Sequence, residues 1–268
     1  MAQGTGHYVS RKDGRVYYDQ RGNGGPLIFM HAVGLSGWSW RKVIDSFAEH
    51  FTCYNIDLPG YDHSDVPARQ YSIEDFTDAV VDVMDSAGIA QTKIVGDHSG
   101  AMMAVDLAVR YPQRVERMAL DGMPYWSKES GQAFFEKNFR PQHTDTTSYD
   151  IPVSPMWTYE EALAHYPSWD RELWAKREEI KSKSRLWVRL SQDANTGYDM
   201  QEAGPKVKAP TLLIYGAGDL KRFDGERAHE GIKGSTLKIF SESPGGAHDI
   251  MPEEFTRTAL EFLLEGRQ

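Results

Sequence analysis

The sequence predicts an α/β fold in which a mostly parallel sheet is covered by helices on both faces. Short apolar runs of strand length recur along the chain, and segments whose apolar residues have helical spacing separate them. Glycine or polar residues follow these runs, so the loops begin where the strands end. Because parallel strands have their carboxyl ends at one edge of the sheet, we expect a functional site at that edge.

Each expected element has its own signal. Residues 14–19 alternate and precede a glycine-rich turn at 22–25, which predicts a first hairpin. Ser72 is a capping residue with Asp75 three positions later, so a helix is expected to begin there. Apolar runs predict strands at 26–30, 51–57, 115–120, 210–215 and 236–240 and one that leads into Gly96, and helical spacing predicts helices at 38–49, 73–87, 102–110 and 252–264.

Composition excludes several classes of function. The chain has 268 residues, which suits one α/β domain with an insertion, and a net charge of −9, so neither a nucleic acid nor an anionic membrane is an expected partner. Its one cysteine, Cys53, allows no intramolecular disulfide and is expected in the core. No apolar stretch approaches about 18 residues, so we expect a cytoplasmic protein. A homodimer stays possible.

The α/β alternation stops between residues 123 and 206. Five of the seven tryptophans lie there: Trp126, Trp157, Trp169, Trp174 and Trp187. We interpret 123–206 as a helical lid inserted into a core made of 1–122 and 207–268. Most of these aromatic side chains are expected to pack the lid onto the core, while a few, with Trp126, Trp157 and Trp187 as candidates, line a pocket for a bulky apolar or aromatic substrate. Nothing in the sequence specifies a clamp for a carboxylate or phosphate.

The segment Gly96-Asp97-His98-Ser99-Gly100 lies between a strand and a helix. This is the context of a nucleophile elbow, a strained turn that needs small residues two before and two after its apex. Gly96 and Gly100 occupy those places, so His98 is the expected apex. A shifted register with Ser99 at the apex would put Asp97 where a small residue belongs. In the favoured register Asp97 precedes the apex and is expected to point away from the site.

Five motifs follow one another in the order of a known family. They are His31-Ala32-Val33-Gly34, Asp57-Leu58-Pro59-Gly60-Tyr61, Arg110-Tyr111-Pro112-Gln113-Arg114-Val115, Gly216-Ala217-Gly218-Asp219 and Gly246-Ala247-His248. With the elbow, they make residues 15 to 265 resemble the α/β-hydrolase superfamily. The resemblance implies an eight-stranded sheet and a site in the order nucleophile, acid, histidine. The chain departs from the family pattern at the apex, where His98 replaces serine, and in the first motif, where Ala32 replaces glycine.

The resemblance implies a role for each residue after a strand. His248 would be the general base, and Asp219 would orient it, with Asp121 as the alternative acid. The N–H groups of Val33 and Ser99 would form the oxyanion hole. The Ser99 hydroxyl is a second candidate for the nucleophile.

Two histidines are expected at the same edge of the sheet. His98 has three interpretations: a covalent nucleophile, a non-covalent base or hydrogen-bond donor, or the remnant of a lost nucleophile. His31 is expected to fix its loop and to lie beside the substrate. Together with His248 these residues match no known ligand spacing, so neither a metal nor a cofactor is expected.

Three functions remain open from the sequence. The leading hypothesis is a cofactor-independent hydrolase of an ester, a lactone or an activated C–C bond. A lyase or other proton-transfer enzyme using two histidines and an aspartate is the second. The third is a protein that binds a ligand on this scaffold without turning it over.

Overall fold

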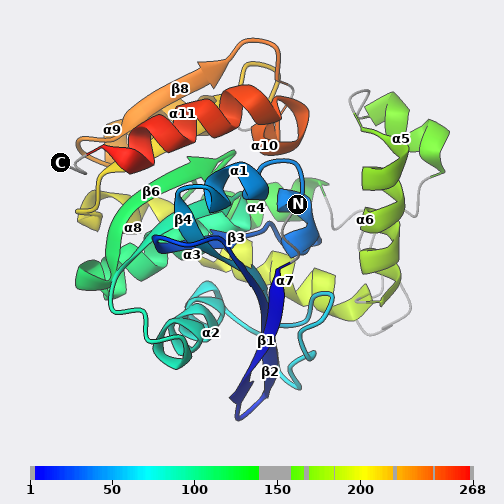
Figure 1. Ribbon diagram of the computed structural model, residues 1–268. Helices are drawn as coiled ribbons and strands as arrows, with labels where there is room; N and C mark the ends of the chain where they lie inside the picture. The colour runs from blue at the N-terminus through cyan, green and yellow to red at the C-terminus, as the bar shows by residue number, and fades with distance from the viewer. Residues whose placement is uncertain are drawn as a thin grey trace.

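A single eight-stranded sheet organises the chain in the computed structural model, which describes residues 4–138, 158–165, 169–183, 185–219, 222–243 and 245–265 (Figure 1). The strand order is β1-β2-β4-β3-β5-β6-β7-β8. β1 and β2 pair antiparallel with their neighbours, and the other strand pairs are parallel, as expected. The strands are β1 Thr5–Arg11, β2 Gly14–Arg21, β3 Gly25–Met30, β4 Phe51–Asp57, β5 Thr92–Asp97, β6 Val115–Asp121, β7 Thr211–Gly216 and β8 Thr236–Phe240.

Helices lie on both faces of this sheet and between β6 and β7 (Figure 1). None of those in the described ranges is long and apolar enough to cross a membrane. They are η1 Gly37–Trp40, α1 Ile44–Ala48, α2 Ile73–Ser86, α3 Ser99–Arg110, η2 Pro112–Arg114, α4 Lys128–Asn138, α5 Tyr159–His165, α6 Arg171–Lys183, α7 Arg185–Gly197, α8 Met200–Ala203, η4 Gly204–Lys206, α9 Arg222–Gly231, α10 Ala247–Ile250 and α11 Pro252–Leu264.

The central strand β3 shows how the two faces are covered. Leu27 and Phe29 pack into a cluster with side chains of α1 and α11, whereas Ile28 and Met30 face a second cluster built largely by α2 and α3. All four side chains are fully buried. Because successive side chains of a strand point to opposite faces, a continuous apolar run is what a strand covered on both sides requires.

Two expected elements differ in the structure. The hairpin joins β1 to β2, with Arg11 opposite Gly14, and the glycine-rich turn at 22–25 instead leads to β3, which pairs in parallel with β4 and β5. The polar composition of β1 hid it, because an edge strand does not need a continuous apolar run. The expected helix at 38–49 is interrupted between η1 and α1. The other expected helices and strands are present, and α2 begins with a capping box made by Ser72 and Asp75.

The insertion, residues 123–206, contains α4 to α8. In Figure 1, α5 and α6 stand to the right of the sheet and α7 leads back towards it. Several polar contacts join the insertion to the rest of the chain, among them the following. Lys176 Nζ of α6 lies 3.0 Å from a carboxylate oxygen of Asp62, Lys42 Nζ lies 3.3 Å from Asp170, and Trp187 Nε1–H of α7 donates to the carbonyl of Pro59 over 2.7 Å.

Candidate active site

The backbone places His98 at the apex of the elbow. Its φ of 48° and ψ of −105° are strained for a residue other than glycine, and it stands between the end of β5 and the start of α3. A Cβ at Gly100 would lie 2.1 Å from the carbonyl oxygen of Met30, and one at Gly96 would lie 2.9 Å from the backbone of Ala101. Both glycines are therefore required by close backbone packing, as the sequence predicted.

His248 and Asp121 form a buried pair at the carboxyl edge of the sheet. The Nδ1 of His248 lies 2.8 Å from Oδ2 of Asp121, and the backbone N–H of His248 donates to the same oxygen over 3.2 Å. The two residues are 3% and 0% exposed. Burial alone would lower the pKa of His248, but the charges of Asp97 and Asp121 and the hydrogen bond outweigh it and raise that pKa. An imidazole oriented in this way can accept a proton at Nε2.

The preference for Asp219 as the acid partner is corrected by this pair. The carboxylate of Asp219 lies against the turn before His248, where a Cβ at Gly245 would be 3.1 Å from its Oδ2. β6 and β7 are neighbours that end side by side, so an acid after either strand is near the histidine. The turn that leads to His248 runs through Gly245 and Gly246, both with positive φ. Asp121, which the sequence analysis gave as the alternative acid, is the one that contacts Nδ1 of His248.

Asp97 belongs to the same cluster, which corrects the expectation that it points away. It is 7% exposed, and one carboxylate oxygen of Asp97, one of Asp121 and a ring nitrogen of His248 lie within 4.8 Å of one another. Burial, reinforced by the charge of Asp121 and opposed by that of His248, raises the pKa of Asp97 to about 7. Asp97 and Asp121 are direct partners in the β5–β6 register, so they share a face of the sheet. Two neighbouring strands that both end in aspartate are the sequence signal for this cluster.

Ser99 is fully buried and its hydroxyl is held between two donors. Its Oγ accepts the N–H of Val33 over 3.1 Å and the side-chain N–H of Asn195, from α7, over 3.0 Å. The Val33 N–H expected in the oxyanion hole is thus occupied by a side chain of the elbow itself. Nδ1 of His98 lies 3.4 Å from the same Oγ, a long contact. The structure therefore gives Ser99 a positioning contact with the insertion and withholds its hydroxyl from solvent.

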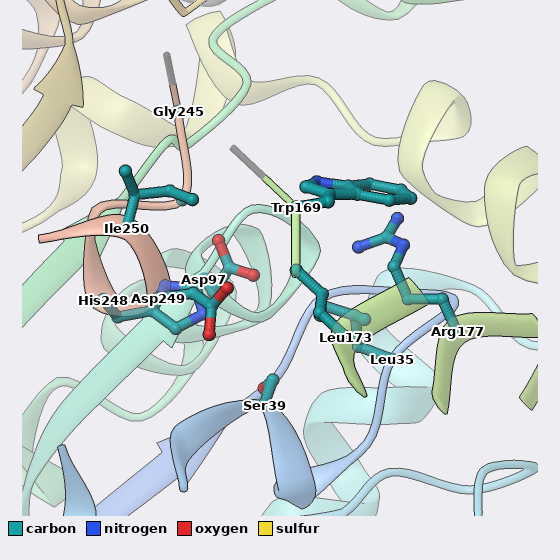
Figure 2. A pocket seen from close by; sticks show the side chains of 11 residues that line it. Leu35, Ser39, Asp97, Trp169, Leu173, Arg177, Gly245, His248, Asp249 and Ile250 are labelled. Atoms are coloured by element: carbon teal, nitrogen blue, oxygen red, sulfur yellow. The ribbon is translucent and has the colours of Figure 1, made fainter. Parts of the chain in front are cut away.

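A small open cavity of about 80 Å³ lies over the His248 edge. Figure 2 shows Asp97, His248 and Asp249 on one side of it and Trp169 and Arg177, from the insertion, on the other. The lining residues are Leu35, Ser39, Asp97, Trp169, Leu173, Arg177, Gly245, Gly246, His248, Asp249 and Ile250. His98 is not among them.

The expected substrate-contacting residues lie elsewhere. Trp187 packs against Tyr71 and Phe76, and Trp126 donates from Nε1 to the carbonyl of Asn195 over 3.2 Å. Both are nearly buried: Trp187 joins the insertion to the core, and Trp126 joins two parts of the insertion to each other.

Two further expectations about the pocket have different outcomes. His31 is fully buried, accepts the N–H of Leu58 at Nε2 over 2.9 Å, and has its pKa lowered by burial, so it fixes its loop. Trp157 lies outside the described residues. Trp169, which the sequence did not select as a pocket residue, lines the cavity two residues before α6 begins.

Two clusters in the described part of the chain could offer three ligand atoms to a metal ion. One is Asp97, Asp121 and His248. The other is Asp57, Asp62 and His63. In each, an internal contact already joins histidine Nδ1 to an aspartate over 2.8 Å. Binding a metal through those atoms would break the contacts that position the side chains.

Comparison with known proteins identifies the family. A family model described as alpha/beta hydrolase fold matches residues 25–253, so the chain belongs to the α/β-hydrolase-fold family. The chain is 21% identical over 233 residues to (E)-2-((N-methylformamido)methylene)succinate hydrolase of Acinetobacter baylyi, covering 85% of this chain and 86% of that protein. It is 35% identical over 112 residues to 2-hydroxymuconate semialdehyde hydrolase of Pseudomonas sp. CF600, covering 40% of each.

The fold is also shared with solved structures. The enol-lactonase from Burkholderia xenovorans LB400 superposes with a TM-score of 0.77 at 23% identity, over 97% of this chain and all of that one. An esterase from Exiguobacterium antarcticum gives a TM-score of 0.79 at 19% identity. At these identities the likeness concerns the fold.

Proposed function

We propose that this protein is a cofactor-independent hydrolase that cleaves an ester, a lactone or an activated C–C bond. The buried His248–Asp121 pair beside a cavity is the observation that carries the proposal. A histidine oriented by a carboxylate can take a proton from a nucleophile or water and return it to the leaving group. The names of the relatives, a succinate-derivative hydrolase and a semialdehyde hydrolase, support the same general reaction.

His98 holds the nucleophile position in this proposal. The neutral imidazole of His98 would attack the carbonyl carbon and lose its N–H proton to His248, which would pass that proton to the departing alcohol or enolate. Water would then cleave the acyl-imidazole, giving the acid and returning a proton to His98. The backbone N–H of Ser99, at the start of α3, would face the developing oxyanion, and the insertion would act as a lid over the cavity. The substrate would be small enough to enter the cavity from its open side.

A lyase or other proton-transfer reaction is the second candidate, and Asp97 is the observation that favours it. A carboxyl group whose pKa is about 7 lies beside a histidine whose pKa is raised. A carboxyl group that can hold a proton near neutral pH and a histidine that can accept one can act as acid and base on one substrate. In that reaction no covalent acyl-enzyme would form.

Intact-protein mass spectrometry tests these alternatives. The protein is mixed with an activated aryl ester and quenched within milliseconds, as wild type, His98→Ala, Ser99→Ala and His248→Ala. A transient acyl mass that is lost only with His98→Ala supports the histidine nucleophile. An adduct lost only with Ser99→Ala would contradict it. Turnover without any adduct, lost with His248→Ala, would indicate direct water attack, and an absence of turnover with any ester would contradict hydrolysis.

A further inference from the structure

Two polar atoms in the cavity wall have no hydrogen-bond partner within the part of the chain that the structure describes. They are Oγ of Ser39 and Oδ2 of Asp249, in residues that are 2% and 8% exposed. A buried polar atom that stays unpaired costs free energy, so such atoms call for an explanation where they occur. Because both residues line the cavity beside His248, a molecule bound there could pair with both atoms.

Ser39 is held close to the proposed base by its neighbour in η1. Trp40 is fully buried and packs against the ring of His248, with 4.5 Å between the two ring centroids. The backbone N–H of Ser39 donates to the carbonyl of Ser36 over 2.9 Å, which fixes the turn. Figure 2 shows Ser39 in the wall of the cavity, below Asp249. A group that binds to Ser39 would therefore lie next to the base.

The second atom, Oδ2 of Asp249, belongs to a carboxylate whose charge is compensated from its other side. Oδ1 of Asp249 lies 2.9 Å from Nη1 of Arg41 and 3.1 Å from Nζ of Lys42. These ion pairs fix the carboxylate and leave Oδ2 as an acceptor. An anionic ligand would be repelled by this oxygen, and a cationic one would gain little, because two cations already contact the carboxylate. A neutral hydrogen-bond donor is the group that fits Oδ2.

A hydroxyl group satisfies both residues at once. It can donate its O–H to Oδ2 of Asp249 and accept a hydrogen bond from the Ser39 hydroxyl. An ether oxygen lacks the donor, and a methyl group lacks both functions. The aliphatic side chains of Leu35, Leu173 and Ile250 line the same cavity and suit the carbon part of a ligand.

We propose that Ser39 and Asp249 form a subsite for a hydroxyl group on the substrate, close to the carbonyl group on which His248 acts. The inference rests on the proposed function, because it names the substrate class of the same site. That class is an ester, lactone or ketone with a free hydroxyl on a carbon near the reacting carbonyl. Ser39 and Asp249 come from distant parts of the chain, so no local sequence pattern indicates the subsite.

Equilibrium binding of three matched ketones tests the inference without requiring turnover. In hydroxyacetone, methoxyacetone and 2-butanone, the carbon beside the carbonyl carries a hydroxyl, a methoxy or a methyl group. Ligand-observed NMR at pH 7 measures their affinities for wild type, Ser39→Ala and Ser46→Ala, a control at a half-buried serine of α1 that does not line the cavity. We expect hydroxyacetone to bind most tightly. Ser39→Ala should weaken it about three- to tenfold and leave 2-butanone unchanged, because one neutral hydrogen bond is lost.

Two further measurements separate a ligand-binding role from a structural one. Ser39→Ala removes a buried hydroxyl that makes no hydrogen bond within the described residues, so the Tm without ligand should rise while hydroxyacetone affinity falls. Misfolding does not produce that combination. Asp249→Asn replaces one carboxylate oxygen by an N–H donor, so the preference for hydroxyacetone over methoxyacetone should narrow.

The outcomes distinguish this subsite from the proposed reaction. The inference would be overturned by hydroxyacetone binding no tighter than that of 2-butanone, by a loss of affinity that Ser46→Ala matches, or by a lower Tm of Ser39→Ala. Ser39-dependent binding of hydroxyacetone in a protein that turns over no ester would uphold the subsite and refute hydrolysis. Ester turnover together with equal binding of the three ketones would do the reverse.

Discussion

At the residue scale, the register between β5 and β6 brings two aspartates of the site together. β5 and β6 are parallel neighbours in which Asp97 is opposite Asp121. Paired residues share a face, so both carboxylates lie on the side where α10 places His248. Ionising a buried carboxyl group beside a second carboxylate is costly, so the pKa of Asp97 is raised to about 7, and the charge of Asp97 in turn raises the pKa of His248. The cluster therefore contains a carboxyl group, Asp97, that changes protonation near neutral pH.

Replacing each of the two candidate acids separately by asparagine distinguishes their roles. Asp121→Asn should reduce kcat by roughly 10²–10⁴-fold, because the amide no longer orients His248 or stabilises its charged form. Asp219→Asn should leave kcat within about threefold, since its carboxylate lies against the turn and Asp121 already holds Nδ1. Steady-state kinetics on the hydrolysed ester checks both variants. An equal decrease in kcat for both variants would indicate that Asp219 also orients His248.

Removing the charge of Asp97 should alter the pH profile in a defined direction. General-base catalysis needs neutral His248, and the negative charge of Asp97 raises the pKa of that histidine. Asp97→Asn should therefore move the acidic limb of kcat/KM to lower pH. Profiles between pH 5 and 9 measure this, with Glu49→Gln, an exposed position, as the charge control. A limb that stays in place, or moves to higher pH, would contradict the coupling.

At the element scale, the insertion is fastened by a few polar contacts and by aromatic packing. Trp187 of α7 is nearly buried and donates a hydrogen bond to the carbonyl of Pro59. Asn195 of the same helix donates a hydrogen bond to the Ser99 hydroxyl in the elbow. α6, which carries the cavity residues Leu173 and Arg177, is held at Asp62 through Lys176. The pKa of Asp62 is lowered because Lys176 and hydrogen bonds outweigh its burial. This contact therefore positions the outer wall of the cavity.

Loss of the Lys176 charge should loosen α6. Lys176→Met leaves the nearly buried Asp62 carboxylate without this cation, which favours a displaced helix. KM should rise by about fivefold or more with kcat within about twofold, because the outer wall moves and the base does not. Hydrogen exchange in α6 should accelerate in parallel. Lys183→Met, at an exposed position of the same helix, is the control, and an identical effect there would exclude a specific role for the contact.

At the scale of the whole molecule, the active-site cluster affects the free energy of unfolding. The pKa of Asp97 is raised to about 7 from a value near 3.9 in unfolded chains, so the folded state binds the extra proton between these values. The contribution of Asp97 to the free energy of unfolding therefore decreases as the pH rises from about 3.9 to about 7. His248, whose pKa is raised, contributes stability that is present below about 6.5 and is lost as pH rises through its folded pKa. Both groups act in the same direction.

Thermal unfolding should report this linkage. The Tm of the wild type should decrease between pH 5.5 and 8, and Asp97→Asn should flatten that decrease, because the titrating carboxyl group is gone and less charge raises the pKa of His248. Scanning fluorimetry in matched ionic strength provides the measurement, with Glu49→Gln again as the control. A variant curve as steep as that of the wild type would show that other groups dominate the dependence.

The sequence by itself determined the fold class, most strand and helix positions, the elbow with His98 at its apex, and His248 as the base candidate. These are local features: an apolar run, a capping pair or two glycines around a strained turn specify their structure within a few residues. Only the tertiary structure decided between Asp121 and Asp219 as the partner of His248, and only it placed Asp97 in the same cluster. It also showed that the N–H of Val33 donates to the Ser99 hydroxyl and that Trp169 and Arg177 line the cavity. Those outcomes depend on strand register, on the path of a glycine turn and on how the insertion docks, and each joins residues that lie far apart in the chain.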